Sequence, residues 1–173
     1  MSTVVVLNGT SSAGKTTIAR AFQHRAPSPF LNFSIDSILY TLPDVTAVPY
    51  MDLDTAYYAC LGALVNVGRD VITDNAIVTR EQAERLVAAV DGHRVLLVSV
   101  TAPAEMLAQR EEARGDRRLG MAVRQLELID RWIDYDLRID TSVTSAEEGA
   151  QQIVDALSGA TLKAFARTHA WLS

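Results

Sequence analysis

The sequence predicts an α/β fold built on a parallel β-sheet with helices on both of its faces. Short apolar runs alternate with stretches of helical periodicity from one end of the chain to the other, which is typical of crossover connections between parallel strands. The runs, such as the β-branched run at residues 3–8, are of the kind found in strands buried on both faces. With 173 residues the chain is long enough for a sizeable core, so we expect residues 1–173 to form a single domain.

The individual elements follow from these patterns and from their start and stop signals. The predicted strands are residues 3–8, 30–36, 70–74, 94–100 and 137–141. The predicted helices are residues 16–25, a helix that ends near 66, 80–90, 103–114, 121–133 and 145–157. The segment 40–54 contains two prolines and no clear periodicity, so we expect a loop or short helical turns there, and we expect the tail 158–173 to be helical.

The composition disfavours some classes of partner. A formal net charge of −5 and a pI of about 5.1 argue against nonspecific nucleic-acid binding, which needs a basic face. No apolar run is long enough to span a membrane, and the apolar run at 3–8 leads into a glycine loop, unlike a signal peptide. Cys60 lies in an apolar stretch, so we expect a small buried hydrophobe, and a single cysteine fits a reducing compartment. We therefore expect a cytoplasmic protein without nucleic-acid or membrane partners, and we leave open whether it forms a homo-oligomer.

Residues 9–16 form the motif G-x-x-x-x-G-K-[ST] between a predicted strand and a predicted helix. Glycines let the backbone approach a ligand closely, and successive N–H groups with the positive end of the helix dipole form a cradle for an anion. Lys15 supplies a mobile charge toward the outer phosphates of ATP, and the Thr16 hydroxyl is placed to hold Mg²⁺. The predicted nucleotide-binding residues of the loop are Gly9, Thr10, Ser11, Ser12, Ala13, Gly14, Lys15, Thr16 and Thr17. The alternative, a glycine-rich turn that binds nothing, is disfavoured by the strand–loop–helix context.

Two aspartates are expected near this loop, because ligands of parallel sheets bind beyond the carboxyl ends of the strands. Asp36 follows the second predicted strand and could accept a proton from a hydroxyl that attacks the γ-phosphate. It could also be the N-cap of a helix at 37–42, and the two roles are compatible. Asp74 ends the third predicted strand, where it is a candidate support for Mg²⁺ beside Thr16 or, alternatively, a cap or turn residue.

The segment 109–118 carries four arginines, and such a charge run is most often a solvated helix face. Arg110 and Arg114 are four residues apart, on one face of the predicted helix, and a glycine follows that allows the chain to break. Arginines on a lid can neutralise charge on a transferring phosphoryl group. We therefore predict a lid at about 110–121, with Arg110 as a contact to the nucleotide.

Several stretches resemble the chloramphenicol phosphotransferase-like family in order and spacing. They are "VVVLNGTSSAGKT", "FSIDSIL", "VITDN", "REEARGDRRLGMAVRQ" and "YDLRIDTS", and the resemblance covers about residues 4–157. The glycine loop alone would indicate only the P-loop superfamily. The aspartate in "FSIDSIL" and the "ARGDR" and "GMA" stretches are much more specific.

The resemblance implies a P-loop kinase fold, a three-layer sandwich whose five parallel strands lie in the order 2-3-1-4-5 below a helical lid. The family enzyme transfers the γ-phosphate of ATP to a primary hydroxyl of chloramphenicol, which inactivates the antibiotic. By position, Asp36 matches the proposed catalytic base of the family, and Arg114 and Arg117 fall in the lid. Lys15 matches the lysine of the ATP loop.

The chain departs from the family pattern at Asn75, where the family has a second acidic residue, in the short segment 43–54, and in the tail after Gly159. The segment 43–54 should shape the acceptor pocket. We therefore expect an ATP- and Mg²⁺-dependent kinase of a small-molecule hydroxyl: chloramphenicol, another antibiotic or an ordinary metabolite. The alternatives are a kinase of a nucleotide-sugar, as in zeta-type toxins, or of a polynucleotide end, and a nucleotide-binding module whose hydrolysis switches a partner.

Overall fold

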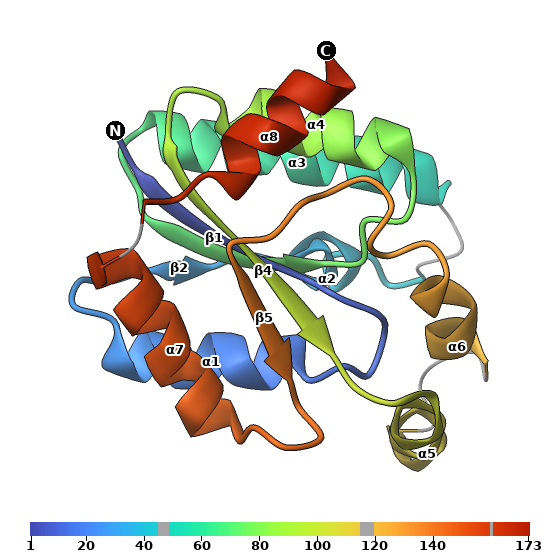
Figure 1. Ribbon diagram of the computed structural model, residues 1–173. Coiled ribbons are helices and arrows are strands. Elements are labelled where there is room, and N and C mark those ends of the chain that lie inside the picture. Colours follow the sequence, from blue (N-terminus) through green and yellow to red (C-terminus); the bar gives the residue numbers. More distant parts are fainter. Residues whose placement is uncertain (45–48, 115–119, 160) are drawn as a thin grey trace.

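The computed structural model of the chain describes residues 1–44, 49–114, 120–159 and 161–173, without the side chains of Tyr50, Met51 and Arg114. Its centre is a five-stranded parallel sheet in the order β2-β3-β1-β4-β5 (Figure 1). The strands are β1 (Thr3–Asn8), β2 (Leu31–Asn32), β3 (Val71–Asn75), β4 (Arg94–Thr101) and β5 (Leu137–Asp140). This order confirms the one that the family resemblance implies.

Helices cover both faces of the sheet, as the alternating sequence pattern predicts. The helices are α1 (Lys15–Arg25), α2 (Ile35–Leu39), α3 (Tyr50–Asn66), α4 (Arg80–Val90), α5 (Ala104–Arg114), α6 (Met121–Leu126), α7 (Ala146–Gly159) and α8 (Ala164–Leu172). Figure 1 shows α3, α4 and α8 on one face and α1 and α7 on the other. The helices α5 and α6 lie beyond the carboxyl end of β4, so they border the edge of the sheet at which the glycine loop lies.

The middle of the central strand β1, residues 4–7, is apolar because it contributes to two cores. Val4 and Val6 point into the core beneath α3 and α4, whereas Val5 and Leu7 point into the core beneath α1 and α7. All four side chains are at most 1% exposed. Successive strand residues face opposite sides of a sheet, so the middle of a strand that is covered on both faces has apolar residues at successive positions.

The second strand is much shorter than the sequence predicts. Instead of residues 30–36, only Leu31 and Asn32 pair with β3, and α2 begins at Ile35. Ser34 is the N-cap of α2, and its N–H donates to Ser37 Oγ at 3.2 Å. The N-cap interpretation of Asp36 is therefore wrong, because Ser34 takes that position and Asp36 lies in the first turn of the helix.

Two further expectations are corrected. The helix predicted at 121–133 ends at Leu126 and is followed by turns, in which the N–H groups of Leu128 and Ile129 both donate to the Gln125 carbonyl, at 3.0 and 2.9 Å. The carbonyl of Ile129 accepts from Asn8 Nδ2 at 3.0 Å and from the Tyr135 hydroxyl at 3.1 Å. Cys60 is exposed rather than buried, because the buried side of α3 is occupied by larger side chains such as Tyr57 and Leu61.

The tail of the chain folds back on the sheet as a helix, which confirms the expectation for this segment. The helix α8 packs on α4 and β4, with Ala164 and Leu172 buried in the first core. Within the described part of the chain, no helix combines the length and the apolarity that a membrane span requires.

We expect Gly9→Ala to destabilise the fold, because Gly9 lies against β4. A Cβ atom at this position would lie 2.1 Å from the carbonyl oxygen of Val100, far inside van der Waals contact. Overpacking of this kind costs about 2 kcal/mol or more. Urea unfolding measures the effect, with Gly159→Ala as the control, because nothing lies within 4 Å of a Cβ atom there. Equal midpoints for the two variants would contradict the close approach of the loop to β4.

Candidate functional site

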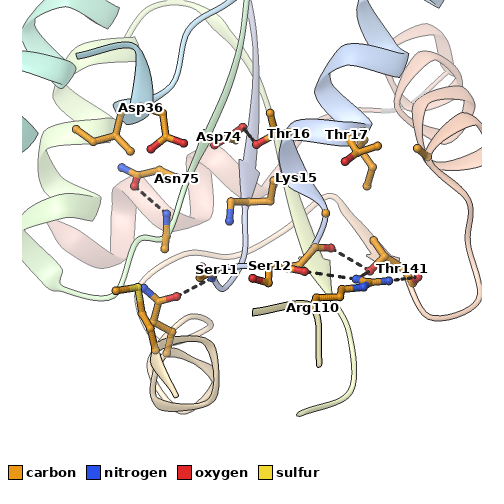
Figure 2. A pocket seen from close by; sticks show the side chains of 18 of the residues that line it. Ser11, Ser12, Lys15, Thr16, Thr17, Asp36, Asp74, Asn75, Arg110 and Thr141 are labelled. Carbon is orange, nitrogen blue, oxygen red and sulfur yellow. Dashed lines mark hydrogen bonds between the residues drawn. The ribbon is translucent and has the colours of Figure 1, made fainter. Parts of the chain in front are cut away.

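A cavity of about 820 Å³ opens at the carboxyl ends of β1 and β3. It is bordered by the glycine loop, by the start of α2, by α5 and α6, and by the turn that follows β5 (Figure 2). Asp36, Asp74 and Lys15 come from three different elements and all line it. The rule that ligands bind beyond the carboxyl ends of parallel strands thus placed the cavity correctly.

The loop between β1 and α1 has the backbone conformation of an anion cradle. Gly14 has φ 96° and Ser12 has φ 62°, both in the left-handed region, and α1 begins directly afterwards at Lys15. Left-handed turns point successive N–H groups into a concave surface, and the helix start adds unpaired N–H groups and the positive end of its dipole. The loop is therefore shaped to receive phosphate oxygens.

Two hydroxyl groups in this loop lack partners. Among the described residues, Thr10 Oγ1 and Ser12 Oγ are the buried side-chain polar atoms that make no hydrogen bond. Buried polar groups are nearly always paired, so an orphaned pair in one loop calls for a ligand or water. Both atoms lie in the segment that the motif assigns to a nucleotide, so the residues present fit that ligand.

Lys15 lies folded over the loop. Its Nζ donates to the carbonyl oxygens of Gly9 and Thr10, each at 2.8 Å. The ammonium group is therefore held at the wall of the cavity, and Figure 2 shows it between Asn75 and the loop serines. A charge at this point is available to an anion that enters the cradle.

Thr16 and Asp74 meet at the edge of the cavity. The Thr16 hydroxyl donates to Asp74 Oδ2 at 3.0 Å, and Asp74 is 6% exposed. The register of β1 with β3 pairs Leu7 with Asp74 and so brings this carboxylate to the start of the loop. Hydroxyl and carboxylate oxygens suit Mg²⁺, which usually takes one or two protein ligands and completes its shell with water and phosphate oxygens. The Thr16 hydroxyl and the Asp74 carboxylate would supply the protein ligands that this manner of Mg²⁺ binding needs.

Asp36 reaches the cavity from the side opposite the loop, where Figure 2 shows it beside Asn75. Asn75 donates from Nδ2 to the Tyr58 hydroxyl at 3.0 Å and accepts from the backbone N–H of Ala76 at 2.8 Å. The departure from the family pattern at Asn75 thus places a neutral, hydrogen-bonded amide next to the candidate base. Ile35 and Leu39 supply apolar lining on this side.

Arg110 of α5 lies against the glycine loop and the turn after β5. Its guanidinium donates to the Thr141 hydroxyl at 2.8 Å, to the Thr141 carbonyl at 3.1 Å and to the Ser12 carbonyl at 3.4 Å. It also lines the cavity, as expected of a nucleotide contact. Arg117 and the side chain of Arg114 lie outside the described residues, so their predicted place in the lid stays a prediction.

Three side chains in or next to this site are not predicted from the sequence. Glu111 is 1% exposed and accepts from the N–H groups of Gly120 at 2.6 Å and Ala122 at 3.1 Å. Gln125 Oε1 accepts from the Ser11 N–H at 2.7 Å, and Thr141 binds Arg110. Gln125 and Thr141 belong to stretches that resemble the family, which is the one signal that could have found them. Glu111 lies in a charge run, whose pattern predicts a solvated side chain.

Comparisons with known proteins agree with this geometry. A family model described as "Chloramphenicol phosphotransferase-like protein" matches residues 2–158. A Mycobacterium tuberculosis protein named as a candidate O-phosphotransferase is 30% identical over 179 residues, which cover 87% of this chain and 80% of the relative.

Solved structures extend the likeness to the fold. The APS kinase CysC of Mycobacterium tuberculosis, in complex with AMPPNP and APS, has a TM-score of 0.72 at 16% identity over 91% of this chain and 98% of that chain. The tunicamycin resistance protein of Deinococcus radiodurans has a TM-score of 0.64 at 19% identity, over 94% of this chain and 98% of that chain. The fold is that of a P-loop kinase.

We expect Glu111→Leu to lower the free energy of unfolding by about 2–4 kcal/mol, because two N–H groups at the start of α6 would lose their acceptor. Glu112→Leu on the exposed side of α5 is the matched control and should change stability little. Urea unfolding of both variants checks this, and a Glu111→Leu variant as stable as the control would show that this buried carboxylate does not fasten α6.

Proposed function

Because the chain belongs to the chloramphenicol phosphotransferase-like family, and is a phosphotransferase with the P-loop kinase fold, we propose that it transfers the γ-phosphate of ATP to a hydroxyl group of a small molecule. The observation that carries this proposal is that a phosphate cradle and a carboxylate on the opposite wall border one cavity. The loop supplies the cradle, and Asp36 is the carboxylate. A donor phosphate and an acceptor hydroxyl can then meet between them.

The loop binds the donor in this proposal. The N–H groups of residues 9–16 and the Lys15 ammonium hold the β- and γ-phosphates, and Arg110 borders the nucleotide where it leaves the loop. Thr16 and Asp74 would hold Mg²⁺, which neutralises charge on the phosphate oxygens. Both side chains are already in hydrogen-bond contact, so their position needs no rearrangement.

Asp36 is the proposed general base. Its carboxylate takes the proton of the acceptor hydroxyl while the hydroxyl oxygen forms a bond to the γ-phosphorus. The bond between that phosphorus and the bridging oxygen breaks, so that ADP and a phosphorylated acceptor are the products. Arg114 and Arg117 would close over the transferring group and exclude water, which would otherwise hydrolyse ATP.

In this proposal the acceptor lies beside Asp36. The described residues that line the cavity include the apolar side chains of Leu39, Val78 and Met121 and the amides of Asn75 and Gln125. A neutral molecule with an apolar body and a free hydroxyl, such as chloramphenicol or a related antibiotic, suits this lining, and its phosphorylation would confer resistance. We place the enzyme in the cytoplasm, in keeping with its single cysteine.

The function is tested by ADP release from ATP and Mg²⁺ against a panel of hydroxyl compounds that includes chloramphenicol, with product masses measured. We expect acceptor-dependent ADP release and a gain of one phosphoryl group on at least one neutral compound. If a nucleotide-sugar gained the phosphoryl group instead, the acceptor would belong to the class that zeta-type toxins phosphorylate. ADP release that no acceptor changes would contradict the transfer reaction.

We expect Asp36→Asn to retain ATP affinity and to lower the rate of transfer by about 10²–10⁴-fold, the usual contribution of a general base. Asn keeps the size and polarity of the side chain but cannot take the proton at neutral pH. Asp52→Asn, on the exposed side of α3, is the control. Loss of ATP binding in Asp36→Asn would show instead that the carboxylate supports the metal or the loop.

A further inference from the structure

The glycine loop contains a strained residue that is not glycine. Ser12 has φ 62°, and it is the one described residue other than glycine with a positive φ. A side chain in this region of conformational space costs free energy and persists only where the surroundings impose it. The Ser12 side chain gives no such support, because its hydroxyl makes no hydrogen bond.

Three consecutive loop residues are instead held by side chains from three other segments. The Ser11 N–H donates to Gln125 Oε1 at 2.7 Å, from α6. The carbonyl of Ser12 accepts from Arg110 at 3.4 Å, and the carbonyl of Ala13 accepts from the Thr141 hydroxyl at 2.9 Å. Each contact is made to the backbone, so each acts on the conformation of the loop directly.

These side chains are themselves fixed. Arg110 and Thr141 bind one another at 2.8 Å, which joins the contact from α5 to the contact from the end of β5 (Figure 2). Gln125 lies one turn after the start of α6, which the buried Glu111 fastens to α5. The loop is thus held from two sides by side chains that are themselves bonded to other elements or lie on an element so fastened.

We propose that Gln125 and Thr141, together with Arg110, are positioning residues that impose the strained conformation on the glycine loop before any nucleotide arrives. A loop already in its binding conformation does not spend binding free energy on reaching it, so nucleotide affinity depends on these contacts. This inference rests on the proposed function only in that the ligand is a nucleotide; the state of the free loop is a separate property.

The test compares Gln125→Leu with the wild-type protein. Gln125→Leu keeps the bulk of the side chain and removes the acceptor of the Ser11 N–H. Calorimetry with AMPPNP and Mg²⁺ should give a Kd about 2- to 10-fold higher than that of the wild-type protein, which corresponds to the net contribution of one hydrogen bond. Hydrogen exchange of the nucleotide-free protein should be faster at the loop amides. Gln151→Leu, on the exposed side of α7, is the matched control and should change neither quantity.

A double-mutant cycle separates this role from general support of the fold. Glycine adopts a positive φ without strain, so Ser12→Gly should make the loop less dependent on its contacts. Gln125→Leu should therefore raise the Kd by a smaller factor in the Ser12→Gly background. The same factor in both backgrounds, or an unchanged Kd and exchange rate in Gln125→Leu, would overturn the proposal.

Thr141 gives a second, independent variant if Gln125→Leu does not fold. Thr141→Val removes the hydroxyl and should raise the Kd for AMPPNP, whereas Thr141→Ser keeps the hydroxyl and should stay within about twofold of wild type. Equal affinities for the Val and Ser variants would overturn the proposal. If the wild-type protein did not bind AMPPNP, the proposed function would fail, and hydrogen exchange would still decide whether these side chains hold the loop.

Discussion

The turn between β1 and α1 is the constraint on which the rest of the site depends. The chain must pass from a strand buried on both faces to a helix start within a few residues, while Gly9 lies against the carbonyl of Val100. Left-handed backbone angles at Ser12 and Gly14 make this sharp turn possible, and they also point the N–H groups of the loop inward. The backbone geometry that connects β1 to α1 therefore also forms the concave surface to which we assign the phosphates.

The parallel sheet then decides which side chains meet this loop. Because all described strands end at one edge, Asp74 of β3 comes to Thr16 of α1, and the short β2 delivers α2 with Asp36 to the opposite wall. In the proposed reaction the phosphate cradle and the candidate base thus come from different elements, the loop before α1 and the helix α2. Substitutions on the acceptor side, such as Asn75, can change the acceptor while the phosphate cradle stays intact, as expected of a fold that carries different sites.

Much of this could be read from the sequence, because local patterns determine it. The apolar runs predicted the strands, and the strand–loop–helix motif with the carboxyl-end rule predicted the meeting of Thr16 and Asp74. Tertiary contacts determined the rest. Ser34 caps α2 and so ends β2 early. Glu111 is buried although it lies in a charge run, because two amides at the start of α6 donate to it. No local pattern places Gln125 beside Ser11, since that contact joins residues far apart in the chain.

The central claim is that the loop binds the phosphates of a nucleotide, and calorimetric titration of the wild-type protein tests it most directly. AMPPNP and AMP are compared in the presence of Mg²⁺, since both carry the same base, ribose and α-phosphate. Charged hydrogen bonds contribute about 1.5–3 kcal/mol each, so we expect AMPPNP to bind at least tenfold more tightly than AMP. Equal affinities for the two nucleotides, or no binding of AMPPNP, would contradict a phosphate-binding role for the loop.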